Sequence, residues 1–210
     1  MNNTVVWLNV QYTCIDERGA GVSGSRERIV EAIIAVVAES GIEAASVRTV
    51  AQRAGVSIGA VQHHFRTKAQ MLGAAMGLIS AAVTAGVEEA AGSGASPAEV
   101  LRTLAEILAI VEDDDRPMAG VWLDFVALSR VTPALAEIHR SGWARLRQTL
   151  TELIRLAHPG HPEPAAAAEA ALAVFDGVAV ARVAEPDFMT GARASAILDR
   201  VLGGIAAETR

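Results

Sequence analysis

The sequence has a single cysteine and few aromatic residues, and each shortage excludes a class of protein. Cys14 is the only cysteine in 210 residues, so an internal disulfide framework is excluded and a reducing compartment is favoured. Aromatic residues make up 4% of the chain, and the residues that favour strands form no alternating runs. Alanine, the best helix former, is abundant in nearly every segment. With 51% hydrophobic and 20% charged residues, the composition excludes a disordered chain and predicts an all-α protein.

The sequence also lacks a catalytic or metal-binding pattern that can be argued from spacing. It has no Gly-rich phosphate loop, no metal motif and no arguable Ser-His-Asp arrangement. His63 and His64 are neighbours on a predicted helix and point about 100° apart, so they do not easily ligate one ion. His158 and His161 are suitably spaced but have no third ligand nearby. We therefore expect no enzyme, no metal site and no cofactor.

No signal peptide is visible, because Met1 is not followed by basic residues and a long apolar stretch. One uncharged stretch, the nineteen residues between Lys68 and Glu88, is about long enough to cross a bilayer. It contains three glycines and several polar residues, and its apolar members are mostly alanine. This composition favours a long buried helix over a membrane span. We expect a cytoplasmic protein without a membrane partner.

The formal net charge of −6 argues at first against a nucleic-acid partner, but the charge is unevenly distributed. Residues 25–70 carry six Arg or Lys against four Asp or Glu, whereas residues 71–210 carry eleven against eighteen. The N-terminal part is therefore locally positive and the remainder negative. Any DNA-binding surface is expected at one end of the chain.

The hydrophobic periodicity predicts about nine helices and two domains. Residues 1–24 are predicted to be a poorly ordered N-terminal extension, and Val22 is a candidate for the true start of translation. A helix-turn-helix domain is predicted over residues 25–70, and a larger helical domain for ligand binding and dimerisation over 71–210. Helices are expected to begin near Ser25, Val47, Ser57, Lys68, Ser96, Arg116, Pro133, Pro164 and Gly191.

Residues 46–72 carry the pattern of two short helices joined by a tight turn. Ala51 is small enough to lie where the helices cross, and Gly55, four residues later, suits the turn. Val61, six residues further on, closes the joint. Ser46 and Ser57 precede the two helices as N-caps. This spacing predicts a helix-turn-helix, whose second helix enters the major groove of DNA.

Residues 25–72 also resemble the DNA-binding domain of TetR-type regulators, and the string AGVSIGAVQHHFRTK is close to that family's signature. The resemblance implies that Thr49, His64 and Lys68 contact phosphates. Lys68 is also the only lysine in the chain, and its amine at a helix N-terminus suits a phosphate.

The remaining residues of the second helix are candidates to approach the bases: Ser57, Ile58, Gly59, Ala60, Gln62 and His63. Many relatives carry tyrosine where this chain has Gln62, so its target, a phosphate or a base, stays open. Gln62 can bond adenine through two hydrogen bonds, and Ile58 can touch a thymine methyl group. Arg48 and Arg53 are further candidates for contacts to the DNA backbone.

The C-terminal part resembles, more weakly, the BetI-like, choline-repressor class of the same family. The resemblance lies in VWLDF at 121–125, the helix containing Trp143, and FDGVAVARVAEP at 175–186. It implies a homodimer formed by the last two helices and an effector pocket among the middle helices. Candidate pocket residues are Met76, Met118, Trp122, Asp124, Phe125 and Trp143. Asp124, on an otherwise apolar helix face, hints at a cationic effector.

Together these features predict a ligand-responsive repressor that binds a palindromic operator in double-stranded DNA as a homodimer and is released by a small molecule. The fourth helix, from Lys68 past Met76, is the expected link between DNA and effector. Two alternatives stay open, a transcriptional activator and a helical dimer that does not bind DNA.

Overall fold

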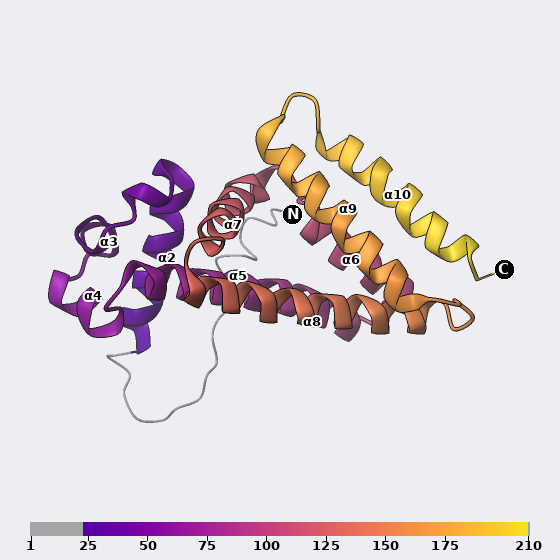
Figure 1. The fold of residues 1–210 in the computed structure, drawn as a ribbon, viewed down its shortest axis with the longest axis horizontal. Helices are drawn as coiled ribbons and strands as arrows, with labels where there is room; N and C mark the ends of the chain where they lie inside the picture. The colour runs from indigo at the N-terminus through magenta and orange to yellow at the C-terminus, as the bar shows by residue number, and fades with distance from the viewer. Residues whose placement is uncertain (1–22, 210) are drawn as a thin grey trace. The chain divides into compact units, whose positions relative to one another are not determined.

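Nine α-helices and two short 3-10 helices build the part of the chain that the computed structural model describes, residues 23–209, and no strand occurs there. This confirms the all-α prediction. The elements, labelled in Figure 1, are α2 (Ser23–Ser40), η1 (Ile42–Ala44), α3 (Val47–Ala54), α4 (Ile58–His64), α5 (Lys68–Gly92), α6 (Pro97–Leu108), η2 (Asp113–Asp115), α7 (Arg116–Ser129), α8 (Pro133–Ala157), α9 (Pro164–Ala184) and α10 (Gly191–Ala207).

The helices form two compact units. Of the described residues, the first comprises 23–81 and 120–139, and the second 82–119 and 140–209. Helices α5, α7 and α8 each contribute residues to both units. The predicted division into a DNA-binding domain and an effector domain concerns function, and it stays a prediction.

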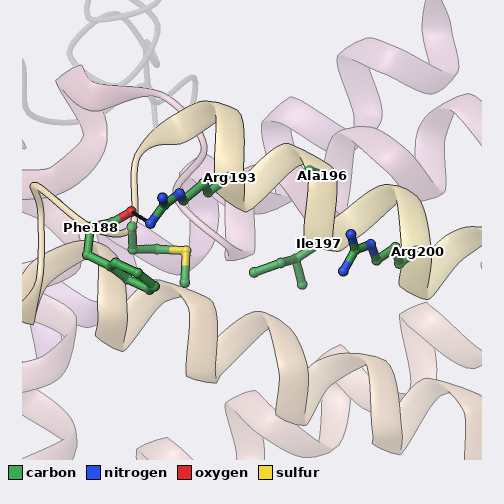
Figure 2. A pocket seen from close by; sticks show the side chains of 6 residues that line it. Phe188, Arg193, Ala196, Ile197 and Arg200 are labelled. Carbon is green, nitrogen blue, oxygen red and sulfur yellow. Dashed lines mark hydrogen bonds between the residues drawn. The ribbon is translucent and has the colours of Figure 1, made fainter.

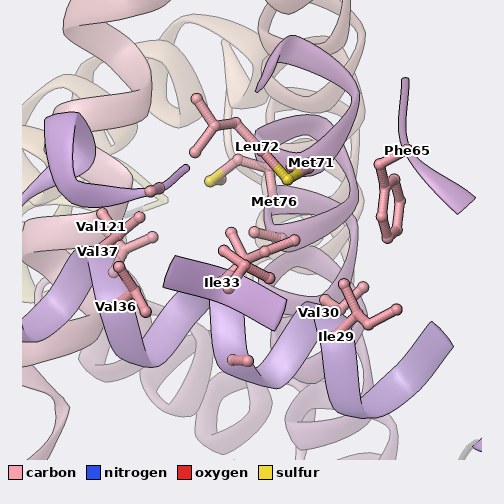
Figure 3. Packing of buried hydrophobic residues seen from close by; sticks show 14 of the residues in the cluster. Ile29, Val30, Ile33, Val36, Val37, Phe65, Met71, Leu72, Met76 and Val121 are labelled. Carbon is pink, nitrogen blue, oxygen red and sulfur yellow. The ribbon is translucent and has the colours of Figure 1, made fainter. Parts of the chain in front are cut away.

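The core of the first unit is built around one face of α2. Ile29, Ile33, Val36 and Val37 recur at helical spacing and are at most 5% exposed, as their periodicity predicts. They belong to one cluster with residues of α3, α4, α5 and α7. Figure 3 shows this α2 stripe with Met71, Leu72 and Met76 of α5. Burying each large side chain stabilises the unit by roughly 1.5–3 kcal/mol.

The core of the second unit depends on small side chains. Four alanines on α6, α9 and α10 are at most 1% exposed, and they share a cluster with Phe175, Leu198 and Ile154: Ala105, Ala168, Ala171 and Ala194. Because alanine occupies little volume, helices that bury it approach one another closely.

Helix α6 starts at a capping box: the Ser96 hydroxyl accepts from the Glu99 N–H, and the Glu99 carboxylate accepts from the Ser96 N–H.

A buried arginine holds the end of α6 in the second unit. Arg182 of α9 is fully buried and donates to the carbonyl oxygens of Ile110 (2.7 Å), Val111 (3.1 Å) and Met189 (2.8 Å). It also pairs with Asp113 at 2.5 Å. The sequence after Ser96 predicts a helix to about Val111. Ile110 has a φ of +53°, however, and α6 ends at Leu108.

Two expectations about the ends of elements need correction or fall outside the structure. Residues 1–22, including Cys14 and Val22, lie outside the described residues. Ser23 and Gly24, assigned from sequence to the N-terminal extension, belong to α2. Their Gly/Ser composition indicated a linker, but Arg28 Nε donates to the Gly24 carbonyl oxygen at 3.1 Å within this first turn.

Two of the described helices, α5 and α9, are long and apolar enough to cross a membrane by length and composition alone. Core helices of soluble proteins pass the same test. In α5, the residues Met71, Leu72, Ala75 and Met76 are at most 5% exposed and belong to the core of the first unit. This burial places the N-terminal part of α5 in that core, and 28% of the apolar window of α5 is buried in total.

The Arg182 network leads to a stability prediction. We expect Arg182→Met to lower the free energy of unfolding by about 3–5 kcal/mol, because three carbonyl oxygens and Asp113 lose their donor. Arg155→Met is the matched control, since Arg155 forms an exposed pair with Glu152 and should change stability little. Urea unfolding followed by circular dichroism measures both variants, and equal effects would contradict a special role for Arg182.

Candidate nucleic-acid interface

The turn between α3 and α4 has the backbone geometry that the sequence predicts. Gly55 follows α3 with φ 64° and ψ 34°, in the left-handed region that favours glycine. The Val56 N–H donates to the Ala51 carbonyl oxygen at 3.0 Å, and the Gly55 N–H donates to that of Gln52 at 3.3 Å. These two bonds close the end of α3 in a Schellman arrangement. The turn therefore fixes the direction in which α4 leaves.

Both short helices start at a serine cap. The Ser46 hydroxyl accepts from the Thr49 N–H at 3.1 Å, and the Ser57 hydroxyl accepts from the Ala60 N–H at 3.1 Å. Each bond satisfies a backbone donor that the helix itself leaves free. Ala51 and Val61 are at most 3% exposed and join the core of the first unit. The two short helices are thus held by serine caps at their N-termini and by burial of Ala51 and Val61 in the core.

Most side chains of α4 that sequence reasoning assigned to bases are exposed. Ser57, Ile58, Gly59, Gln62 and His63 are exposed, whereas Ala60 is half-buried. Ile58 is 49% exposed although it is a large apolar residue. A Cβ at Gly59 would lie 3.8 Å from the Ser57 Oγ, an ordinary contact, so packing does not require glycine there. Their contact with bases stays a prediction.

The candidates for phosphate contacts lie at the ends of α3, α4 and α5. Arg48 and Thr49 are exposed in the first turn of α3, and the Thr49 hydroxyl lies 2.8 Å from the Ser46 hydroxyl. His64 is half-buried at the end of α4. The Lys68 Nζ at the start of α5 lies 3.4 Å from a Glu43 carboxylate oxygen. Since Glu43 is almost fully exposed, this pair is weak.

Arg53, a further candidate from the sequence, is engaged within the chain. Its two terminal nitrogens donate to both carboxylate oxygens of Glu39 at 2.6 Å. The hydrogen bonds from Arg53 lower the pKa of Glu39, and those same bonds raise the pKa of Arg53. The pair joins α3 to α2.

The predicted effector residues are divided between the two units. Met76 and Phe125 are buried in the core of the first unit, and Trp122 and Asp124 are half-buried in that unit. Met118 and Trp143 are half-buried and belong to the second unit. Their contact with an effector stays a prediction.

Asp124 has a role that the sequence did not indicate. Its Oδ2 accepts a hydrogen bond from the Ile42 backbone N–H at 3.1 Å. This bond satisfies a backbone donor at the start of η1, in the segment between α2 and α3. Helix α7 is thereby tied to the scaffold of the helix-turn-helix.

A second carboxylate, missed by sequence reasoning, lies beside Trp143. Asp176 of α9 is half-buried, and its Oδ2 accepts from the Trp143 Nε1–H at 2.9 Å. Burial raises the pKa of Asp176, although the bond from Trp143 acts in the opposite direction. No cation is paired with this carboxylate among residues 23–209. Its sequence signal was an aspartate on a helix otherwise rich in alanine and valine.

Among the described residues, no group of three or more His, Cys, Asp or Glu is placed to hold a metal ion. The capped α3–turn–α4 unit, with its second helix exposed, defines a helix-turn-helix protein.

Comparisons with known proteins agree with this class. Residues 29–75 match the family described as bacterial regulatory proteins, tetR family, and residues 97–207 match the BetI-type transcriptional repressor, C-terminal family. The chain is 34% identical over 160 residues to the transcriptional regulator BetI of Stenotrophomonas maltophilia, covering 73% of this chain and 78% of that protein. It is 39% identical over 106 residues to PksA of Bacillus subtilis, spanning about half of each chain (50% and 51%).

Solved structures give the same result. A transcriptional regulator from Rhodococcus is 35% identical with a TM-score of 0.78, covering 86% of this chain and 95% of that one. A regulator from Saccharomonospora viridis, solved in complex with choline, is 20% identical with a TM-score of 0.76, covering 86% and 96%, and shows likeness of fold. The chain belongs to the TetR family of transcriptional regulators, with a C-terminal part of the BetI type. Proteins of this family regulate transcription and are not enzymes.

Gly55 and Gly59 should differ in how much each contributes to the stability of the fold. We expect Gly55→Ala to lower the free energy of unfolding by about 1–2 kcal/mol, because alanine is strained at positive φ. Gly59→Ala should stabilise by up to about 1 kcal/mol, because Gly59 is helical and has room for a methyl group. Thermal and urea unfolding of both variants check this. A similar loss of stability in both variants would show that the positive φ of Gly55 is not the reason for the loss.

Proposed function

We propose that this regulator is a repressor that acts in the cytoplasm, binds a palindromic operator in double-stranded DNA as a homodimer, and is released by a small cationic molecule. The observation that carries the proposal is the exposed face of α4, which is presented by a turn fixed at Gly55 and by the two serine caps. A rigid, exposed second helix is what reading of the major groove requires.

In this proposal α4 lies in the major groove. Gln62 is exposed and polar, so it can form hydrogen bonds to base edges, and Ile58 offers an apolar contact to thymine. His63 is also exposed, and it can approach either a base edge or a phosphate. Arg48, Thr49, His64 and Lys68 bind phosphates around the groove. The phosphate contacts fix the register and supply affinity, whereas the base contacts supply sequence preference.

Exposed apolar residues on α9 and in the α9–α10 loop support a homodimer. Val174 and Val180 of α9 are at least 36% exposed, and Phe188 in the loop before α10 is 58% exposed. Figure 2 shows a shallow groove here, with Phe188, Arg193, Ile197 and Arg200 along it. The guanidinium of Arg193 lies 4.3 Å from the Phe188 ring centre. We assign a second copy of this chain as the occupant, because a two-fold dimer matches a palindromic operator.

The half-buried carboxylate of Asp176, beside the Trp143 indole, is the feature that favours a cationic effector. Burying a carboxylate without a cation is costly, and an aromatic face with a carboxylate suits a quaternary ammonium group. The choline bound by the Saccharomonospora viridis regulator supports this chemistry. The other predicted effector residues, Met76, Met118, Trp122, Asp124 and Phe125, remain candidates.

Release of DNA follows if the effector binds more tightly to a conformation in which the two α4 helices are wrongly spaced. A coupling of about 1–3 kcal/mol changes the affinity for DNA about 5- to 150-fold. Helix α5, which starts at Lys68 and supplies Met76 to the core, is the proposed link.

The Lys68–Glu43 pair provides a paired test of DNA binding. We expect Lys68→Ala to weaken binding to all duplexes and to reduce the slope of log affinity against log salt by about 1, because one phosphate contact is lost. Glu43→Gln should strengthen binding, because it frees the Lys68 amine. Fluorescence anisotropy with a duplex selected from a random library, across a salt series, measures both.

Gln62→Ala is the companion variant, and it should change sequence preference and leave the salt slope unchanged, because Gln62 is assigned to a base. Sedimentation of the complex tests the expected dimer on one duplex. Failure of the full-length protein to select any duplex, even at low salt, would refute the proposed function.

The effector proposal makes a separate prediction. With choline as the probe, Asp176→Asn should lower affinity by at least about tenfold, because a neutral amide gives up the charge attraction. Asp124→Asn tests the carboxylate singled out from the sequence, and the bond from the Ile42 N–H predicts a smaller effect on affinity. Isothermal titration calorimetry measures both variants. Unchanged binding in Asp176→Asn would exclude this carboxylate as the cation contact.

A further inference from the structure

We propose that DNA binding by this regulator is coupled to proton uptake by His63 and His64 at the end of α4, so that affinity for DNA rises as the pH falls from about 8 to about 6. The inference rests on the proposed function and adds a regulating ligand, the proton, to the same surface.

Both imidazoles lie at the end of α4, the helix that is proposed to enter the major groove. They are the last two residues of α4, and their ring centres are 5.3 Å apart in an edge-to-face arrangement. His63 is exposed, and His64 is half-buried with its ring centre 6.2 Å from that of Phe65. A helix C-terminus favours positive charge. The pair can therefore carry charge without leaving its place on the helix.

Cations outnumber carboxylates on the elements around the pair. The Arg26 guanidinium of α2 lies 5.6 Å from the centre of the Phe65 ring, beside His64. The other cations on the elements around α4 are Arg28 on α2, Arg48 and Arg53 on α3, and Arg66 and Lys68 after α4. Of the carboxylates nearby, Glu39 and Glu43 are paired with Arg53 and Lys68, and Glu27 and Glu31 lie on α2.

These surroundings favour the neutral form of His64 in the free protein. Burial, then the charges of His63 and Arg26, lower its pKa below the ordinary value of 6.5. At neutral pH, His64 is therefore mostly uncharged before DNA arrives. Protonation of His64 in the free protein is unfavourable, because it would add a positive charge to a surface that already holds several cations.

DNA reverses this balance. Phosphates brought close to His63 and His64 favour the charged imidazolium form of both rings. The complex then holds more protons than the free protein. Lowering the pH therefore strengthens binding wherever the histidines are charged in the complex and uncharged in the free protein. Full uptake of one proton gives about tenfold per pH unit.

A different role for His63 predicts the opposite behaviour. If the neutral ring accepts a hydrogen bond from a base, protonation removes that acceptor and weakens binding at low pH. The pH dependence therefore distinguishes phosphate binding by the histidine pair from base reading.

The test uses the full-length protein and a duplex selected from a random library. Anisotropy titrations are made at about pH 8, 7 and 6, at constant ionic strength. Affinity should rise about tenfold in total, which corresponds to uptake of about half a proton on average over these two pH units. His63→Gln and His64→Gln should each reduce this rise, and the double variant should abolish it. His158→Gln, in the loop after α8 of the second unit, is the matched control and should keep the full pH dependence. Circular dichroism at each pH confirms folding.

Calorimetry of the unaltered protein gives a readout that does not depend on any variant. Binding heats near pH 7 in two buffers of different ionisation enthalpy should differ, because protons are taken up with DNA. Binding that is equally tight at every pH, with equal heats, would overturn the inference and leave the proposed function standing. A pH dependence retained in the double variant would also overturn it. Absence of DNA binding at every pH would refute both.

Discussion

Helices α3 and α4 are eight and seven residues long, and isolated helices of that length are not stable in water. Their existence depends on the apolar stripe of α2, which buries Val50, Ala51 and Val61 together with residues of α5 and α7. The serine caps and the Gly55 turn then fix ends that packing leaves unsatisfied. The surface available to DNA is therefore a consequence of a core that lies behind it.

The surface around α4 carries little net positive charge. In a chain with a net charge of −6, the cations near α4 are partly neutralised by Glu39 and Glu43 within the same unit. Such exposed pairs add little stability, and the Lys68–Glu43 pair is open enough to be replaced by a phosphate. The histidine pair has a related property, because its charge depends on what lies beside it. With the proposed DNA binding and proton uptake, both features would make the positive charge conditional on the presence of DNA.

Much of the fold was predictable, because it depends on local rules. Periodicity predicted the α2 stripe, spacing predicted Ala51, Gly55 and Val61 in their observed places, and proline and serine marked the starts of α6, α8 and α9. The errors have local causes as well. Ser23 and Gly24 look like a linker by composition but extend α2, and α6 stops early at Leu108 because the positive φ of Ile110 is stabilised by a distant arginine.

The sequence by itself determined the helices, the turn and the family, because these depend on residues close together in the chain. Only the tertiary structure decided how isolated polar residues are used. Asp124 bonds the Ile42 backbone 82 residues away, Asp176 accepts from Trp143, and Arg182 gathers carbonyl oxygens about 70 residues earlier in the chain. Periodicity carries no information about such partners, because a lone charged residue on a helix looks the same whether it faces solvent, a backbone donor or a ligand.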